Sequence, residues 1–203
     1  MLAPVATETT SGRARTNLTV PNAITMVRLA CIPVFVWLLF GRDNRAAAAG
    51  LLAVLGATDW MDGFVARRWH QVSELGKVLD PTADRLLLIV GVGSIIIDGA
   101  APLWFAWAVV VREVVVGGTL VVLTMAGMER FDVRWVGKAG TFALMFAFPL
   151  FLASHSTLGW ADTAGVLAWV FAIPGLFFSW WSAATYVPVA RRALAEGRRN
   201  RQR

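Results

Sequence analysis

The sequence predicts an all-α integral membrane protein: a six-transmembrane-helix bundle with a polar cavity that faces the cytoplasm. Two observations predict this class. Hydrophobic residues make up 57% of the 203 residues and charged residues only 16%, a balance far from that of a soluble domain. Six apolar stretches with short connections also approach the roughly 20 residues that cross a bilayer. These helices are expected at residues 23–41, 46–66, 77–97, 102–125, 135–154 and 163–187.

One membrane domain with a polar segment at each end accounts for the whole chain. Residues 1–18 lack an apolar core and are expected to form a disordered tail. The membrane domain is expected at 19–190, followed by a basic cytoplasmic tail at 191–203. A secretory signal peptide near the start would remove one helix and leave an odd number of spans, which disfavours it.

The second and third helices carry four aspartates. Their purely apolar parts, Ala46–Ala57 and Leu86–Ile97, cover only 12 residues each, or about 18 Å of helix, which is too short to span. Both helices are therefore expected to continue through the polar segment between them. This places all four carboxylates at membrane depth, where uncompensated charges cost several kcal/mol.

Basic residues are distributed unevenly between the two sides of a six-span arrangement. The side that holds both termini and the aspartates collects most of them, whereas the other side holds mainly Arg42 and Arg45. By the positive-inside rule, this predicts a multi-pass protein of the cytoplasmic membrane with both termini and the aspartates on the cytoplasmic side. The net charge of +6 indicates that the basic residues contact anionic lipid headgroups, and no nucleic-acid partner is expected.

The spacing of the aspartates indicates a divalent-metal site. On a helix, Asp59 and Asp62 are separated by three residues, and Gly76, Asp80 and Asp84 follow one another by four, so each set shares one face. Together the carboxylates offer up to eight hard oxygen ligands with no His or Cys nearby. Such a set suits Mg²⁺ or Mn²⁺ and suffices for two ions, which clamp a phosphoryl group during in-line displacement.

Other residues of the segment suit a phosphate ligand. Gly63 and Gly76 leave room for a large ligand, and Arg67 can pair with a phosphate through two hydrogen bonds. Two other uses of the carboxylates are a cation pathway in a transporter and a buried salt-bridge network. The basic partners in such a network would be Arg67, Arg68, Lys77 and Arg85.

The segment from Asp59 to Asp84 reads DWMDGFVARRWHQVSELGKVLDPTAD. It closely resembles the signature of the CDP-alcohol phosphotransferase family, D-x2-D-G-x2-A-R-x8-G-x3-D-x3-D, and fills all eight fixed positions without a gap. The matching residues are Asp59, Asp62, Gly63, Ala66, Arg67, Gly76, Asp80 and Asp84.

The resemblance implies a role for each of these positions. Asp59, Asp62 and Asp80 would hold the metals, and Asp84 is the proposed general base and also a candidate ligand. The CDP site would be formed by Asp59, Gly63, Ala66, Arg67 and Gly76. The implied reaction transfers a phosphatidyl group from CDP-diacylglycerol to an acceptor alcohol and releases CMP. The family also suggests a homodimer.

Charges in the fourth and fifth helices bear on the acceptor. Arg112 lies inside the fourth predicted span next to Glu113, and Lys138 lies near the start of the fifth. Glu113 could simply neutralise Arg112. Alternatively, Arg112, Lys138 and Arg134 form an anion pocket for an acceptor that carries a phosphate of its own, such as glycerol-3-phosphate, inositol phosphate or phosphatidylglycerol.

The flanking segments narrow the acceptor further. Val20–Phe35 and Val110–Val115 resemble the branch of phosphatidylglycerophosphate synthases and cardiolipin synthases, and Val136–Leu152 is similar to the actinobacterial type of cardiolipin synthase. Phosphatidylglycerol is therefore the expected acceptor, with glycerol-3-phosphate as the alternative. A small cation-coupled transporter is the alternative from a different class, and it would release no CMP.

Overall fold

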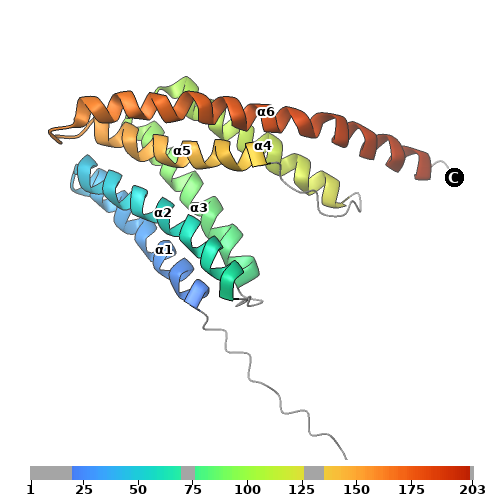
Figure 1. The fold of residues 1–203 in the computed structure, drawn as a ribbon, viewed down its shortest axis with the longest axis horizontal. Helices are drawn as coiled ribbons and strands as arrows, with labels where there is room; N and C mark the ends of the chain where they lie inside the picture. Colours follow the sequence, from blue (N-terminus) through green and yellow to red (C-terminus); the bar gives the residue numbers. More distant parts are fainter. Residues whose placement is uncertain (1–19, 70–75, 126–134, 202–203) are drawn as a thin grey trace, which may run out of the picture.

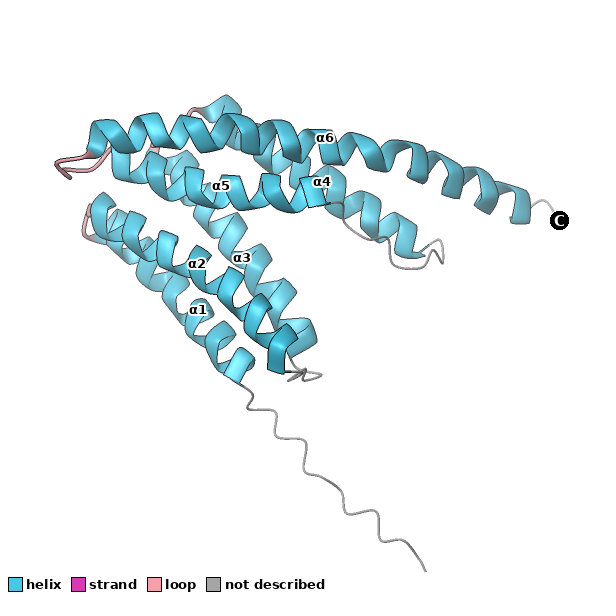
Figure 2. Ribbon diagram, in the orientation of Figure 1, coloured by secondary structure: helices cyan, strands magenta, loops and turns pink. Residues whose placement is uncertain are grey.

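The computed structural model describes residues 20–69, 76–125 and 135–201. Within these ranges the side chains at 20–22, 59–69, 76–82, 84, 120, 122–125 and 186–201 fall outside the description. Apart from short connections, the described chain is helical, and Figure 2 shows no strand in it. The elements are α1 (Val20–Val36), a π-helical turn η1 (Trp37–Gly41), α2 (Arg45–Trp69), α3 (Gly76–Asp98), α4 (Leu103–Met125), α5 (Trp135–Ser154) and α6 (Ala161–Arg201).

The six predicted helices are confirmed, and α2 and α3 do continue through the aspartate segment. Among the residues that the structure describes, three helical stretches are long and apolar enough to cross a membrane: Ala23–Gly41, Trp135–Ser154 and Ala161–Thr185. Most bounds differ by three residues or fewer, and the largest difference is at the end of α6, which does not end near residue 187 but runs to Arg201. Ala193, Leu194 and Glu196 all favour helix, so the end of the apolar run is not the end of the helix.

The helices form two groups that cross at an angle (Figure 1). In the first, α1 packs against both α2 and α3, and the three lie nearly parallel in the view. In the second, α5 and α6 form an antiparallel pair with the most extensive contact in the fold. The groups join where α2 packs against α5, while α4 packs against α6.

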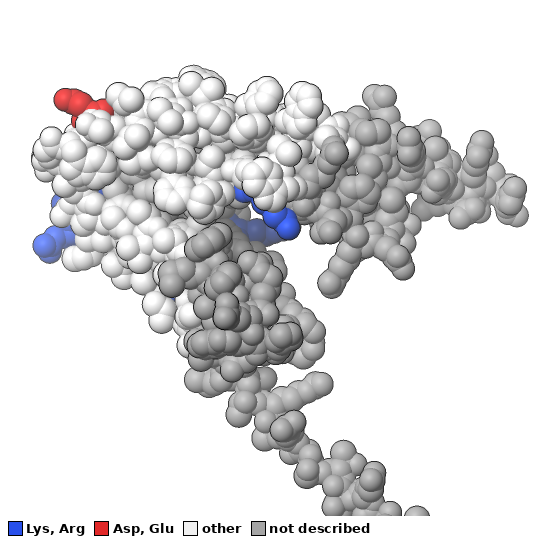
Figure 3. All heavy atoms as spheres, in the orientation of Figure 1, with Lys and Arg blue, Asp and Glu red and all other residues white. Residues whose placement is uncertain are grey.

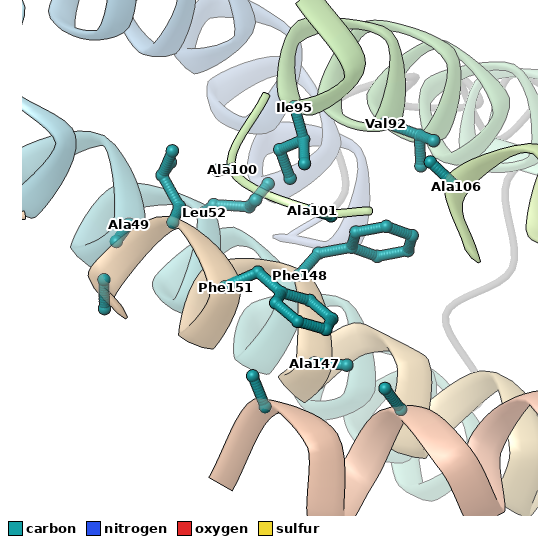
Figure 4. Close-up of a cluster of buried hydrophobic side chains, with 14 of the residues drawn as sticks. Ala49, Leu52, Val92, Ile95, Ala100, Ala101, Ala106, Ala147, Phe148 and Phe151 are labelled. Atoms are coloured by element: carbon teal, nitrogen blue, oxygen red, sulfur yellow. The ribbon is translucent and has the colours of Figure 1, made fainter. Parts of the chain in front are cut away.

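The apolar core lies toward the end of the first group that is opposite the aspartates. Figure 4 shows Ala49 and Leu52 of α2 gathered with Ala147, Phe148 and Phe151 of α5, close to the connection between α3 and α4. Fully buried aromatic packing extends this core, since the Phe105 ring centroid is 5.4 Å from that of Phe151. The core therefore holds the helices together at one end of the bundle, and the aspartates of α2 and α3 lie toward the other end.

Small residues allow α5 and α6 to approach closely. A Cβ atom at Gly140 would lie 2.7 Å from both the backbone nitrogen and Oγ of Ser179, and one at Gly175 would lie 3.1 Å from the Cβ of Ala143. Lipid tails are as apolar as leucine, so helices inside a membrane gain little from burying apolar surface and associate mainly through such close contact.

Candidate functional site

The aspartates occupy corresponding levels of two helices. Asp59 and Asp62 lie in α2, and Asp80 and Asp84 lie in α3. From the helix bounds, Asp59 is about 21 Å from the start of α2 and Asp84 is about 21 Å from the end of α3. The same rise places Asp62 and Asp80 about 26 and 27 Å from those ends. The backbone thus brings both pairs to one end of the α2–α3 hairpin (Figure 1).

The remaining signature residues follow the same two helices. Gly63, Ala66 and Arg67 lie in the last turns of α2, and Gly76 is the first residue of α3. The side chains of the eight signature residues are outside the described part of the structure, and so is the polar cavity predicted around them. Their roles as ligands, base and CDP contacts stay predictions.

An ion pair fixes the opposite ends of these helices to each other. Nε of Arg45, the first residue of α2, donates to Oδ1 and Oδ2 of Asp98, the last residue of α3, at 3.1 Å each. Nη2 of Arg45 lies 3.0 Å from Oδ1, and the Asp98 side chain is only 6% exposed. Such a double contact gives a fixed geometry. It holds these two helix ends at the same level, which keeps Asp59 and Asp84 level at the opposite end of the hairpin.

Two buried polar residues of α1, Thr25 and Arg28, are not among the site residues predicted from the sequence. Thr25 is 2% exposed and Arg28 is 3% exposed. They continue the buried face of the helix, which is apolar at Ile32 and Phe35 and polar one turn earlier in the chain. The spacing of three and four residues along this face was the signal in the sequence that could have found them.

The structure describes only two of the three residues of the predicted acceptor pocket, Arg112 and Lys138. Arg112 is 6% exposed and forms an ion pair through Nη1 with Oε1 of Glu113, as the neutralisation alternative expects. Its Nε atom is buried and has no hydrogen-bond partner within the described chain, so Glu113 satisfies only part of the guanidinium. Lys138 is exposed on α5, and Arg134 lies outside the described residues.

The proposed salt-bridge network between the aspartates and neighbouring basic residues loses one member, because Arg85 is exposed on α3. The other proposed partners, Arg67, Arg68 and Lys77, have side chains outside the description. Most of the described surface is uncharged in Figure 3. The charges in that view gather at the end that carries the α1–α2 and α5–α6 connections and beside the undescribed residues.

The described side chains alone offer no metal site, since no three His, Cys, Asp or Glu residues gather among them. The chemistry of the signature nevertheless fits a divalent ion. Asp59, Asp62, Asp80 and Asp84 supply hard oxygen ligands on adjacent turns of two helices. These four residues would hold Mg²⁺ or Mn²⁺.

A groove of about 490 Å³ lies between α4 and α6, away from this end of the α2–α3 hairpin. Its lining is apolar and aromatic, so it offers no ligand for a metal or a phosphate. The lining residues are Trp104, Phe105, Ile173, Leu176, Phe177, Trp180, Trp181 and Ala184.

Comparison with known proteins supports the reading of the signature. The family model described as CDP-alcohol phosphatidyltransferase matches residues 18–186. A cardiolipin synthase (CMP-forming) of Streptomyces coelicolor is 39% identical over 87% of this chain and 85% of its own length. A CDP-diacylglycerol–glycerol-3-phosphate 3-phosphatidyltransferase of Escherichia coli is 31% identical over 87% of this chain and 97% of its own length.

The matched region includes all of the helices that carry the aspartates, the buried arginines and the ion pair between α2 and α3. It extends over most of the chain, and the identity to both relatives is above 30%. The chain therefore belongs to the CDP-alcohol phosphatidyltransferases, a family of enzymes embedded in the membrane.

Proposed function

We propose that this enzyme transfers a phosphatidyl group from CDP-diacylglycerol to the hydroxyl of phosphatidylglycerol, forming cardiolipin and releasing CMP. The observation that carries the proposal is the complete eight-position signature on α2 and α3. The greater identity to a cardiolipin synthase than to the glycerol-3-phosphate enzyme supports phosphatidylglycerol as the acceptor. Glycerol-3-phosphate is the second candidate, because it also carries a phosphate that suits Arg112. Family membership favours an enzyme over the transporter considered from the sequence.

Each residue of the site has a task in this reaction. Asp84 accepts the proton of the acceptor hydroxyl, whose oxygen then bonds to the phosphorus attached to diacylglycerol. The bond from this phosphorus to the oxygen shared with CMP breaks, and CMP leaves with that electron pair. Arg67 stabilises the negative charge that develops on the phosphoryl oxygens. Gly63, Ala66 and Gly76 leave space for the nucleotide.

Enzymes of this family depend on a divalent metal. Asp59, Asp62 and Asp80 would hold it, joined by Asp84 if that residue is a ligand rather than the base, and the carboxylate number suits two ions. When bound, the metal supplies positive charge next to the reacting phosphoryl group. A carboxylate that binds a metal is a weak base, so the two roles of Asp84 compete.

The acceptor is proposed to bind through its phosphate at Arg112, with Lys138 and Arg134 as further basic contacts. Support comes from the burial of Arg112 and from its Nε, which has no hydrogen-bond partner among the described residues and can donate to an anion. We also propose that the chain crosses the membrane six times with the site on the cytoplasmic side. The homodimer expected from the resemblance is part of this proposal.

Separate reactions with each acceptor test this assignment. Purified enzyme in detergent with CDP-diacylglycerol and Mg²⁺ is given either phosphatidylglycerol or glycerol-3-phosphate, and the lipid products are identified by mass spectrometry. We expect cardiolipin from the first reaction. Phosphatidylglycerophosphate from the second and no cardiolipin from the first would establish the second candidate, and product from neither would contradict both.

Replacement of Arg112 tests the acceptor pocket in the same assay. We expect Arg112→Ala to raise the KM for the acceptor at least tenfold, because a charge-assisted contact to the phosphate is lost. Arg42→Ala is the control, since Arg42 is exposed at the far end of the bundle beside Trp37. An unchanged acceptor KM in Arg112→Ala would show that Arg112 serves only to pair with Glu113.

A further inference from the structure

We propose that Arg28 is a donor-binding residue whose guanidinium contacts the diphosphate of CDP-diacylglycerol. The inference rests on the proposed function, and it adds a third helix to the aspartate site. Burial of Arg28 is the first observation. This side chain is 3% exposed, and a buried guanidinium in a membrane protein is favourable only beside groups that compensate its charge.

The direction of Arg28 follows from the packing of α1. The helix contacts α2 and α3, the two helices that carry the signature. Its buried face contains Thr25, Arg28, Ile32, Phe35 and Leu39, the last of these in the η1 turn. Because α2 and α3 cover this face, the guanidinium lies on the side of α1 that is directed toward the signature helices.

The level of Arg28 matches that of the carboxylates. Arg28 precedes Gly41, the last residue of η1, by 13 positions, or about 20 Å of helix. Asp59 and Asp84 lie about 21 Å from the neighbouring ends of α2 and α3. Since α1, α2 and α3 lie nearly parallel in Figure 1, a cation on α1 stands at the level of the site.

The described acidic residues are placed elsewhere. Asp43 and Asp98 contact Arg45 at the opposite end of α2, Glu113 pairs with Arg112 on α4, and Asp162 lies in the first turn of α6. The negative groups expected at the level of Arg28 are therefore the signature aspartates and, when bound, the donor.

The charge balance distinguishes these two partners. Two divalent ions would cancel the charges of the four carboxylates. The diphosphate link of CDP-diacylglycerol then adds two negative charges, and Arg28 and Arg67 supply two positive ones. A guanidinium also matches phosphate oxygens with two parallel hydrogen bonds, which a lysine cannot reproduce. Arg28 is thus suited to bind the donor once divalent ions occupy the aspartates.

Binding measurements on the purified protein test this assignment. CDP is titrated in the presence of Mg²⁺ by calorimetry, and Mn²⁺ alone is titrated by electron paramagnetic resonance. We expect Arg28→Gln to weaken CDP binding at least tenfold and Arg28→Lys to weaken it less. Mn²⁺ affinity should be unchanged in Arg28→Lys, which keeps the positive charge near the metal site. It should be unchanged or higher in Arg28→Gln, which removes that charge. Arg85→Gln, an exposed arginine on α3, is the control and should bind CDP like the wild type.

Two results would overturn the role of Arg28. One is wild-type CDP affinity in Arg28→Gln, and the other is loss of Mn²⁺ binding together with CDP binding, which would make Arg28 a structural partner of the aspartates. If Arg28→Gln does not fold, Arg28→Lys decides, because unchanged CDP affinity in that variant contradicts two-bond recognition. A wild-type protein that releases no CMP from CDP-diacylglycerol would instead contradict the proposed function.

Discussion

The arginines inside this helical bundle differ in what balances their charge. Arg45 and Asp98 satisfy each other at one end of the α2–α3 hairpin, with two contacts of 3.1 Å from Nε. Arg112 is paired with Glu113 but retains an unpaired Nε within the described part of the chain. Arg28 is buried at the level of the signature aspartates. The first arginine serves the architecture, whereas the other two are proposed to meet the phosphates of the acceptor and the donor.

Asp84 is the residue whose replacement separates chemistry from binding. Asp84→Asn keeps the size of the side chain but removes its basicity and its negative charge. We expect kcat to fall by a factor of about 10² to 10⁴, the usual contribution of a general base, while CDP still binds measurably. The measurement pairs CMP release with calorimetric titration of CDP in Mg²⁺.

A suitable control for that experiment is Asp162→Asn. Asp162 is exposed at the start of α6, so this variant removes a carboxylate outside the site and should turn over like the wild type. Undiminished CMP release by Asp84→Asn would exclude Asp84 as the base. Loss of all CDP binding together with turnover would assign it to the metal site instead.

Among the helices, the α5–α6 pair depends on the absence of side chains. Gly140→Ala would place a Cβ atom 2.7 Å from the backbone nitrogen and Oγ of Ser179. Because the backbone of α6 cannot rotate away as a side chain would, the helices must separate. We expect the variant to lose about 1–3 kcal/mol of stability, the usual range for overpacking, and to melt at a lower temperature in detergent.

Gly117→Ala is the matched control for this prediction. Nothing lies within 4 Å of a Cβ atom added at Gly117, which is also inside a helix. Alanine favours helix over glycine by roughly 0.5–1 kcal/mol, so this variant should melt at or above the wild-type temperature. Equal melting temperatures for the two variants would show that close approach of α5 and α6 does not stabilise the fold.

The helices themselves could be predicted from the sequence because apolar runs of membrane length and the aspartate spacing are both local signals. The predicted bounds of the fifth helix, 135–154, agree with those of α5. The length of α6 could not be read from hydropathy, since helix propensity continues past the apolar run. The spacing of Arg28 from Ile32 and Phe35 places it on the buried face of α1, but spacing alone does not fix its burial, because an arginine can also extend its side chain toward the membrane surface.

Across the whole molecule, apolar packing and polar chemistry are separated along the bundle. The buried core and the Arg45–Asp98 pair lie toward one end of the α1–α3 group, and the aspartate segment lies at the other end. Rigid packing at the first end sets the relative level of α2 and α3 at the second. With the orientation expected from the positive-inside rule, the aspartates are placed where soluble ions and a CDP-lipid of the membrane can meet.

We propose that this protein transfers a phosphatidyl group from CDP-diacylglycerol in a reaction that depends on a divalent metal. The most direct test of this proposal is CMP release by the purified enzyme in lipid vesicles that contain CDP-diacylglycerol and phosphatidylglycerol. We expect CMP release in the presence of Mg²⁺ or Mn²⁺, loss of release on chelation with EDTA, and recovery when the ion is restored. Absence of CMP under all these conditions, or equal release in EDTA, would contradict it.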